Sequence, residues 1–149
     1  MSERTEQPGD AIRARTIETR EATISVEYGG TGPGLLLLHG FPETKYMWRD
    51  VAPRLAAEFT VVCADLRGYG ESSCPPSAND HSPYSKRAMA QDMVQVMTVL
   101  GLEHFAIVGH DQSRHSHHVS GARAVERDRS ARDLVRRRGR TAVALAGAR

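Results

Sequence analysis

A carboxylate follows the last apolar run of the sequence, at a position that suits a nucleophile. The run 105–108 leads directly into Gly109, His110 and Asp111. A tight turn from a strand into a helix holds one side chain above a sheet, needs small residues around it, and offers the next backbone N–H to a developing oxyanion. Gly109 fits the small position two residues before Asp111. An isolated Gly-His-Asp is also common at ordinary strand ends, so the surrounding elements must decide.

Other residues that could carry chemistry have simpler interpretations. His115, His117 and His118 lie close together, but no carboxylate or Cys stands beside them at ligand spacing, so we expect a solvated polar segment and no metal site. Gly68 and Gly70 lack the third glycine and the helix start of a dinucleotide-binding loop. A turn is therefore expected there.

Charge is divided unevenly along the 149 residues. The net charge of +2 averages −5 for residues 1–111 and +7 for residues 112–149. The second segment holds 10 Arg among 38 residues and no Phe, Tyr, Trp, Ile or Met. Such a composition buries too little apolar surface to offset the entropy of ordering. We expect a non-homologous basic tail, irregular or disordered, after a single folded domain at 22–111.

The N-terminal residues 1–21 are also poor in apolar groups, and we expect them to form a flexible leader. No secretory signal and no apolar run of about 18 residues is present, which predicts a cytoplasmic protein without a membrane partner. Cys63 and Cys74 show neither CxxC nor metal-ligand spacing. Both thiols are expected to be reduced.

Between leader and tail, alternating strands and helices predict a parallel α/β sheet. Period-2 alternation indicates a half-buried strand. Short apolar runs between turn residues indicate strands buried on both faces. The strands are expected at 22–28, 35–38, 59–64 and 105–108. A Gly-, Pro- and Ser-rich loop is expected over 67–82.

Two helices are expected between these strands. Thr44 can cap the first, whose apolar residues at 48, 51, 52 and 55 recur at helical spacing. The second covers 85–100, has a methionine-rich face that indicates a core contact, and ends at Gly101. Sites in such sheets gather at the carboxyl ends of the strands. Here these ends are the loops 39–44, 65–73 and 109–113.

Four motifs stand in order along this sheet: LLLLHGFPE at 35–43, YMWR at 46–49, ADLRGYGESS at 64–73 and VGHD at 108–111. Together they resemble the α/β-hydrolase superfamily, in the branch of haloacetate (fluoroacetate) dehalogenases and epoxide hydrolases. The resemblance covers residues 22–111, about the first half of the family's catalytic domain. It implies an α/β fold: the N-terminal half of an α/β-hydrolase domain, with a mostly parallel sheet flanked by helices, followed by the Arg-rich tail.

The resemblance also implies a chemistry. Asp111 is the implied nucleophile, which attacks the carbon of a C–halogen bond or an epoxide, and a His-activated water hydrolyses the ester. The backbone N–H groups of Phe41 and Gln112 are the implied oxyanion or leaving-group site. The implied supporting residues of the motifs are His39, Gly40, Pro42, Gly109 and His110. The substrate is a small molecule, and no cofactor or metal is implied.

The sequence departs from the family pattern directly after Asp111. Gln112 stands where dehalogenases carry Arg and epoxide hydrolases Trp, and Ser113 stands where the turn favours Gly. His115 takes the place of a second Arg, with Arg114 one position away. The later strands, cap domain, acid partner and catalytic His have no counterpart. A frameshift near codons 112 and 113 of a GC-rich gene would produce this tail, and this chain alone is then expected to be inactive.

Three functional classes remain open. The first is a hydrolase with an Asp nucleophile, acting on a small haloacid or, almost equally, on an epoxide. The second is a protein that binds nucleic acid or anionic membrane through the charge of residues 132–140 alone. The tail has no aromatic side chains for base stacking, which argues against specific nucleic-acid recognition. The third is a non-catalytic fragment or inactive scaffold. The sequence leaves the oligomeric state open.

Overall fold

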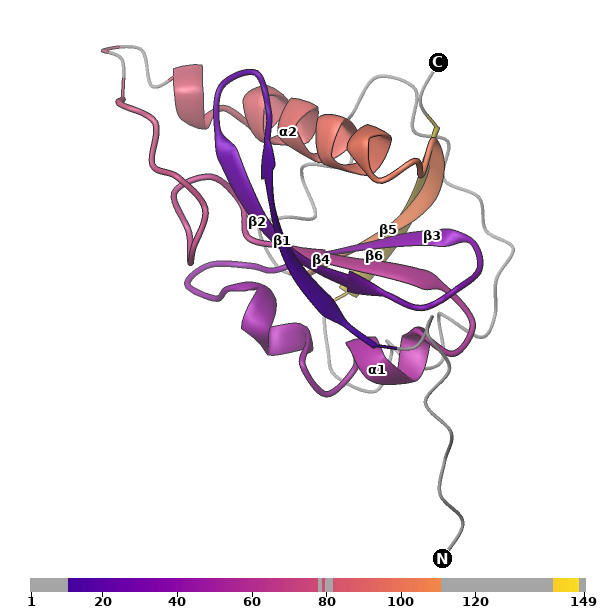
Figure 1. The fold of residues 1–149 in the computed structure, drawn as a ribbon. Helices are drawn as coiled ribbons and strands as arrows, with labels where there is room; N and C mark the ends of the chain where they lie inside the picture. Colours follow the sequence, from indigo (N-terminus) through magenta and orange to yellow (C-terminus); the bar gives the residue numbers. More distant parts are fainter. Residues whose placement is uncertain (1–10, 78, 80–81, 111–140, 148–149) are drawn as a thin grey trace, which may run out of the picture.

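The computed structural model describes residues 11–77, 79, 82–110 and 141–147. Its centre is a six-stranded sheet with the order β1-β2-β4-β3-β5-β6 (Figure 1). The strands are β1 (Arg13–Glu18), β2 (Thr23–Gly29), β3 (Gly34–Leu38), β4 (Thr60–Ala64), β5 (His104–His110) and β6 (Thr141–Gly147). Four of them confirm the strands expected from the apolar runs.

The centre of the sheet is parallel and its flanks are antiparallel. β3 pairs in parallel with both β4 and β5. β2 pairs antiparallel with β4, and β1 antiparallel with β2. Parallel neighbours need a crossover connection, usually a helix, and both crossovers here contain one. The α/β fold is confirmed, with a mixed sheet in place of a mostly parallel one.

The second expected helix is confirmed as α2 (Lys86–Val99). Ser85 caps it, because the Ala88 N–H donates to Ser85 Oγ at 3.2 Å. At the other end Gly101 has a φ of +75°, a left-handed conformation that favours glycine after a helix. There the Leu102 N–H donates to the Met97 carbonyl at 2.9 Å. A short 3-10 helix, η2 (Ser82–Tyr84), precedes α2.

The single first helix expected after residue 44 is wrong, since the structure has two short helices there. They are η1 (Lys45–Trp48), a 3-10 helix, and α1 (Ala52–Leu55). Thr44 caps η1 as expected, accepting from the Tyr46 N–H. Pro53 lies in the first turn of α1, where its missing N–H is tolerated. The same proline could not donate inside one continuous helix, so the segment divides.

The expectation of a flexible leader over 1–21 is wrong for its second half. Residues 13–18 form β1, which pairs with six residues of β2. Ile17 is buried, 3% exposed, and joins the core. The backbone pairing with β2 holds this segment although most of its side chains are exposed. Residues 1–10 lie outside the described part of the chain.

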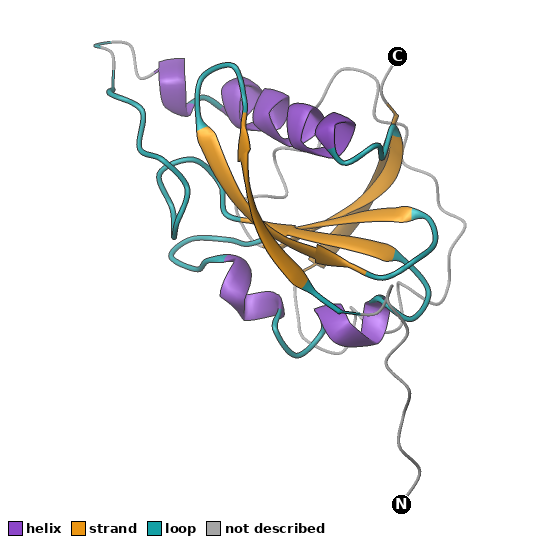
Figure 2. Cartoon of the chain, in the orientation of Figure 1, coloured by secondary structure: helices purple, strands orange, loops and turns teal. Residues whose placement is uncertain are grey.

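Helices cover both faces of the sheet (Figure 2). On one face α2 packs its buried Met93, Val96 and Met97 against the side chains of the central strands. On the other face η1 and α1 bury Trp48 and Leu55 against the alternate strand residues. Leu35 to Leu38 are each 2% exposed or less. This two-sided burial explains the unbroken apolar run of β3.

The basic tail contributes one described element. β6 pairs antiparallel with β5 over seven residues, from His104 opposite Gly147 to His110 opposite Thr141. The sequence analysis expected no strand here. The open edge of β5 supplies hydrogen-bond partners for the backbone of β6. No pattern in the local sequence predicts this pairing. Residues 112–140 and 148–149 lie outside the described residues.

Candidate functional site

The carboxyl ends of three strands lie side by side at one edge of the sheet. In the register of the parallel strands, Leu38 of β3 lies opposite Ala64 of β4 and Gly109 of β5. The next residues along the three strands are therefore His39, Asp65 and His110. Strand ends that meet in this way bring the loops after β3 and β4 beside the end of β5. Two of the site residues expected from the sequence, Asp111 and Gln112, lie outside the described residues.

The loop after β3 forms a tight turn at this edge. The Glu43 N–H donates to the Gly40 carbonyl at 2.9 Å, across a cis Phe41–Pro42 peptide bond. The Phe41 side chain is 60% exposed. Among the described residues, no hydrogen bond uses the Phe41 N–H as donor. That N–H is thus a candidate donor to a ligand.

His39 ties this loop to the loop after β4. It is completely buried, and its Nε2 accepts from the Leu66 N–H at 3.0 Å. Its Nδ1 must then carry the proton, and it lies 3.0 Å from the Gly40 carbonyl oxygen. The Tyr69 ring meets the imidazole edge-on at 5.1 Å. Both ring nitrogens are therefore engaged with the backbone.

Protonation of His39 opposes this arrangement. Burial lowers the pKa of His39 below its ordinary value of 6.5, outweighing the raising effects of the Gly40 carbonyl and of nearby carboxylates. Because the unfolded chain binds a proton at higher pH than the folded chain, the stabilisation is present above pH 6.5 and is lost as the pH falls below it.

We expect His39→Gln to remove that pH dependence, because an amide oxygen can accept from the Leu66 N–H without titrating. The free energy of unfolding, measured by urea denaturation at several pH values, should favour the unmodified chain at pH 8. That advantage should shrink steadily towards pH 5. A difference that stays constant across this range would contradict the assignment.

A charged cluster lies beside the loop after β3, with Lys45 and Asp65 buried and the Glu71 side chain exposed. Lys45, 6% exposed, points its Nζ at Asp65 Oδ2 at 2.9 Å and Glu71 Oε2 at 2.7 Å. Its own backbone N–H donates to Asp65 Oδ1 at 2.7 Å. Burial lowers the pKa of Lys45, but the hydrogen bonds and charges of Asp65 and Glu71 outweigh it and raise the pKa above its ordinary value.

The sequence analysis missed this cluster. Asp65 and Glu71 stand inside a recognised motif, and Lys45 follows another. Charged residues in loops are usually solvated, however, and no spacing rule pairs residues 20 positions apart. The available signal was the place of Asp65, directly after a buried strand.

Glu43 joins the loop after β3 to the end of β5. Its Oε2 lies 3.1 Å from Nδ1 of His110, and both atoms are shielded from solvent. The contact is attractive when the His110 ring is protonated, and its geometry does not make a hydrogen bond. The pair connects the turn that carries Phe41 to the residue directly before Asp111. In the sequence, His110 is expected only as a supporting residue of its motif, and no signal indicates a role for Glu43.

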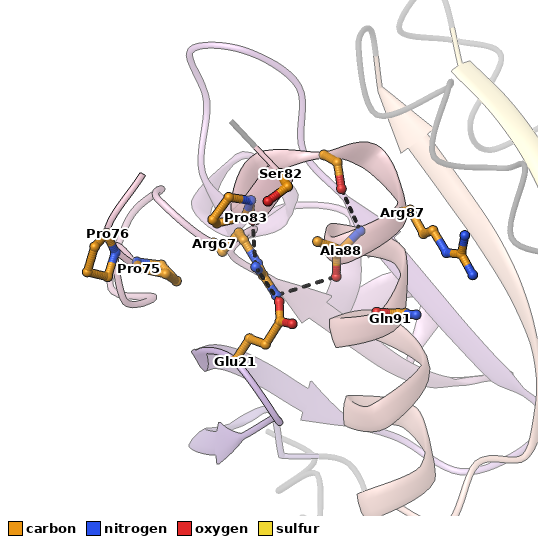
Figure 3. A pocket seen from close by; sticks show the side chains of 10 residues that line it. Glu21, Arg67, Pro75, Pro76, Ser82, Pro83, Arg87, Ala88 and Gln91 are labelled. Atoms are coloured by element: carbon orange, nitrogen blue, oxygen red, sulfur yellow. Dashed lines mark hydrogen bonds and ion pairs between the residues drawn. The ribbon is translucent and has the colours of Figure 1, made fainter. Parts of the chain in front are cut away.

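A pocket of about 450 Å³ opens beside the start of α2 (Figure 3), and none of residues 39–43 lines it. It lies between Pro75, Pro83 and the start of α2, with Arg67 beside Glu21. The Arg67 guanidinium is bonded to Asp92, Glu21 and the Pro83 carbonyl. Because its charge is already paired, we assign the pocket no part in the chemistry.

The described residues contain no group of three or more His, Cys, Asp or Glu that could hold a metal ion. The histidines at 115, 117 and 118 lie outside them. Cys63 and Cys74 are both free, and burial raises the pKa of Cys63 to about 12. Within the described part of the chain, no helix is long and apolar enough to span a bilayer.

Comparisons with known proteins agree with this architecture. The profile of the alpha/beta hydrolase fold matches residues 33–112. A fluoroacetate dehalogenase of Burkholderia sp is 52% identical over 109 residues, which are 73% of this chain and 36% of that protein. A soluble epoxide hydrolase of Corynebacterium sp. (strain C12) is 44% identical over 82 residues, 55% of this chain and 27% of that protein.

A solved structure shows the same arrangement in three dimensions. A Nostoc sp PCC 7120 protein assigned to the alpha/beta hydrolases superposes with a TM-score of 0.68 at 51% identity. The match covers 70% of this chain and 37% of that one. The chain thus spans about a third of the length of these relatives. The family match at 33–112 includes β3, β4, β5 and the loops after β3 and β4.

Proposed function

The chain belongs to the alpha/beta hydrolase fold family, and from this premise we propose that it is the nucleophile-bearing part of a hydrolase in which Asp111 attacks the carbon–halogen bond of a small haloacid. The observation that carries the proposal is the register of β3 and β5. It brings the turn containing Phe41 beside the strand end that leads into Asp111. The Phe41 N–H, which has no acceptor among the described residues, thereby lies at the edge where β5 ends, one residue before Asp111 in the sequence.

The reaction consists of two displacements. A carboxylate oxygen of Asp111 forms a bond to the halogen-bearing carbon, and the carbon–halogen bond breaks with departure of the halide. Water then attacks the carbonyl carbon of the resulting ester, which releases a hydroxy acid and restores the carboxylate. The N–H groups of Phe41 and Gln112 stabilise the oxyanion that forms in the second step.

Water needs a base to attack the ester, and His39 cannot be that base. Its Nε2 lone pair is occupied by the Leu66 N–H, and its Nδ1 proton points at a carbonyl. We therefore assign His39 the role of holding the loop. The water-activating group must be another residue.

An epoxide hydrolase is the second candidate, favoured by the 44% identity to the soluble enzyme of Corynebacterium sp. (strain C12). The same carboxylate would attack an epoxide carbon and open the ring. The leaving oxygen then stays attached to the substrate and must be protonated. This need for an acid separates the two candidates, because a halide leaves without one.

Halide release and diol formation distinguish the candidates directly. Correction of the frameshift expected near codons 112 and 113 would give a longer protein, the protein from the full reading frame. We expect that protein to release fluoride from fluoroacetate and to form little diol from an aryl epoxide. Asp111→Ala should abolish both activities. Asp50→Ala, at an exposed carboxylate, is the matched control and should leave the rate unchanged.

Retained turnover in Asp111→Ala would exclude Asp111 as nucleophile. Diol formation in excess of fluoride release would select the epoxide candidate. The 149-residue chain, assayed in parallel, is expected to show no turnover.

A further inference from the structure

We propose that Lys45 and Asp65 are positioning residues for the backbone donor of Phe41, because their buried ion pair fixes the 39–44 loop to the loop after β4. The inference rests on the proposed function, since it assigns a role within the same site. Neither side chain is required to touch the substrate.

Lys45 is held at two points by a single carboxylate. Its backbone N–H donates to Asp65 Oδ1 at 2.7 Å, and its Nζ donates to Oδ2 at 2.9 Å. Two bonds to one rigid group fix both the position and the direction of the chain at that residue. Lys45 begins η1, only four residues after Phe41. The turn is therefore anchored immediately beyond the donor.

Asp65 is itself held by hydrogen bonds from its backbone and its carboxylate. Its backbone N–H donates to the Ser25 carbonyl of β2 at 3.0 Å, and its own carbonyl accepts from Ser72 Oγ at 2.7 Å. The Glu71 N–H donates to Oδ2 at 3.1 Å. A carboxylate held this way transfers the rigidity of the sheet to the loop.

The energetics favour a positioning role over a stabilising one. Desolvating two charges is expensive, and a buried ion pair often contributes no more stability than apolar residues of similar size. What the burial provides is a defined loop geometry, which backbone donors to an oxyanion require.

Amide hydrogen exchange of the 149-residue chain tests the proposal without any need for catalysis. Lys45→Met keeps most of the length of the side chain and removes its charge. The exchange rates of two amides show whether the loop stays in place. They are the Glu43 N–H, bonded to the Gly40 carbonyl, and the Leu66 N–H, bonded to Nε2 of His39. We expect their exchange to accelerate roughly ten-fold or more relative to the amides of α2, as in local opening.

The matched control is Lys86→Met, the same substitution at the other lysine of the chain, which is exposed at the start of α2. It should leave the Glu43 and Leu66 amides unchanged. Uniform acceleration of exchange throughout the Lys45→Met protein would mean that the ion pair only stabilises the fold. That result would overturn the proposal.

Selective acetylation of the unmodified chain keeps the proposal falsifiable should Lys45→Met not fold. Lys45 should react with acetic anhydride at least about ten-fold more slowly than Lys86, because its ammonium is buried and bonded. Equal rates would show that the pair is open in solution and would overturn the proposal.

Activity separates the failure of this inference from that of the proposed function. In the protein from the full reading frame, Lys45→Met should lower kcat for halide release at least about ten-fold with a smaller change in KM. An opened loop with unchanged kcat would overturn the positioning role while the nucleophile assignment stands. If Asp111→Ala retains activity, the proposed function itself fails.

Discussion

Arg67→Met is expected to destabilise the fold by about 3–5 kcal/mol, the usual effect of removing one partner from a buried ion pair. Arg67 and Asp92 are each 1% exposed and form two parallel bonds, Nε to Oδ2 at 2.7 Å and Nη2 to Oδ1 at 2.8 Å. Methionine would leave the Asp92 carboxylate buried, and the Thr19 hydroxyl, at 2.7 Å, would be its remaining side-chain donor among the described residues. Since domains are stable by about 5–15 kcal/mol, much of the total would be lost.

Urea denaturation of three variants tests this expectation. Arg54→Met, at an exposed arginine, should change the free energy of unfolding by less than about 0.5 kcal/mol. The double variant Arg67→Met/Asp92→Leu should be more stable than Arg67→Met alone, because no uncompensated charge remains. A double variant no more stable than the single one would show that the stranded charge is not the cause.

Gly70→Ala is expected to destabilise the protein and to displace Asp65. Gly70 has a φ of +51°, and a Cβ at this position would lie 2.3 Å from Asp65 Oδ2 and 2.5 Å from its Cγ. Asp65 cannot move aside without breaking its bonds to Lys45. The substitution therefore adds a steric clash to the left-handed strain of about 1–2 kcal/mol that any alanine meets there.

The natural control is Gly101→Ala. Gly101 also has a positive φ, +75°, but a Cβ there has nothing within 4 Å. We expect it to cost only the backbone strain, about 1–2 kcal/mol. Thermal or urea unfolding of both variants then isolates the contact with Asp65. Equal destabilisation by the two substitutions would mean that the Asp65 carboxylate yields freely.

The central strands and α2 were predictable because their signals are local. Four apolar residues between glycines define β3, and Ser85 and Gly101 bound α2. Local signals fail where tertiary contacts decide. β1 buries only Ile17 and depends on its backbone pairing with β2. The division of the first helix at α1 depends on Pro53. The spacing of apolar residues does not show the effect of a proline on a helix.

The candidate site was predictable in part, from its motifs. The loops at 39–44 and 65–73 were placed correctly at the carboxyl ends of the strands, and the register brings them together with the end of β5. The pairing of Lys45 with Asp65 and of Glu43 with His110 was not predictable. Each joins residues from separate loops, and their meeting is a property of the folded sheet.

The most direct test of Asp111 as the nucleophile is the fate of its carboxylate during reaction with fluoroacetate in water enriched in heavy oxygen. The 149-residue chain and the protein from the full reading frame are treated in parallel, and the mass of the peptide containing Asp111 is measured by mass spectrometry. We expect either a carboxymethyl ester on Asp111 or heavy oxygen in its carboxylate, because water attacks the ester at the Asp111 carbonyl carbon. If the Asp111 peptide of both proteins carries neither the ester nor heavy oxygen, the assignment of Asp111 as nucleophile is contradicted.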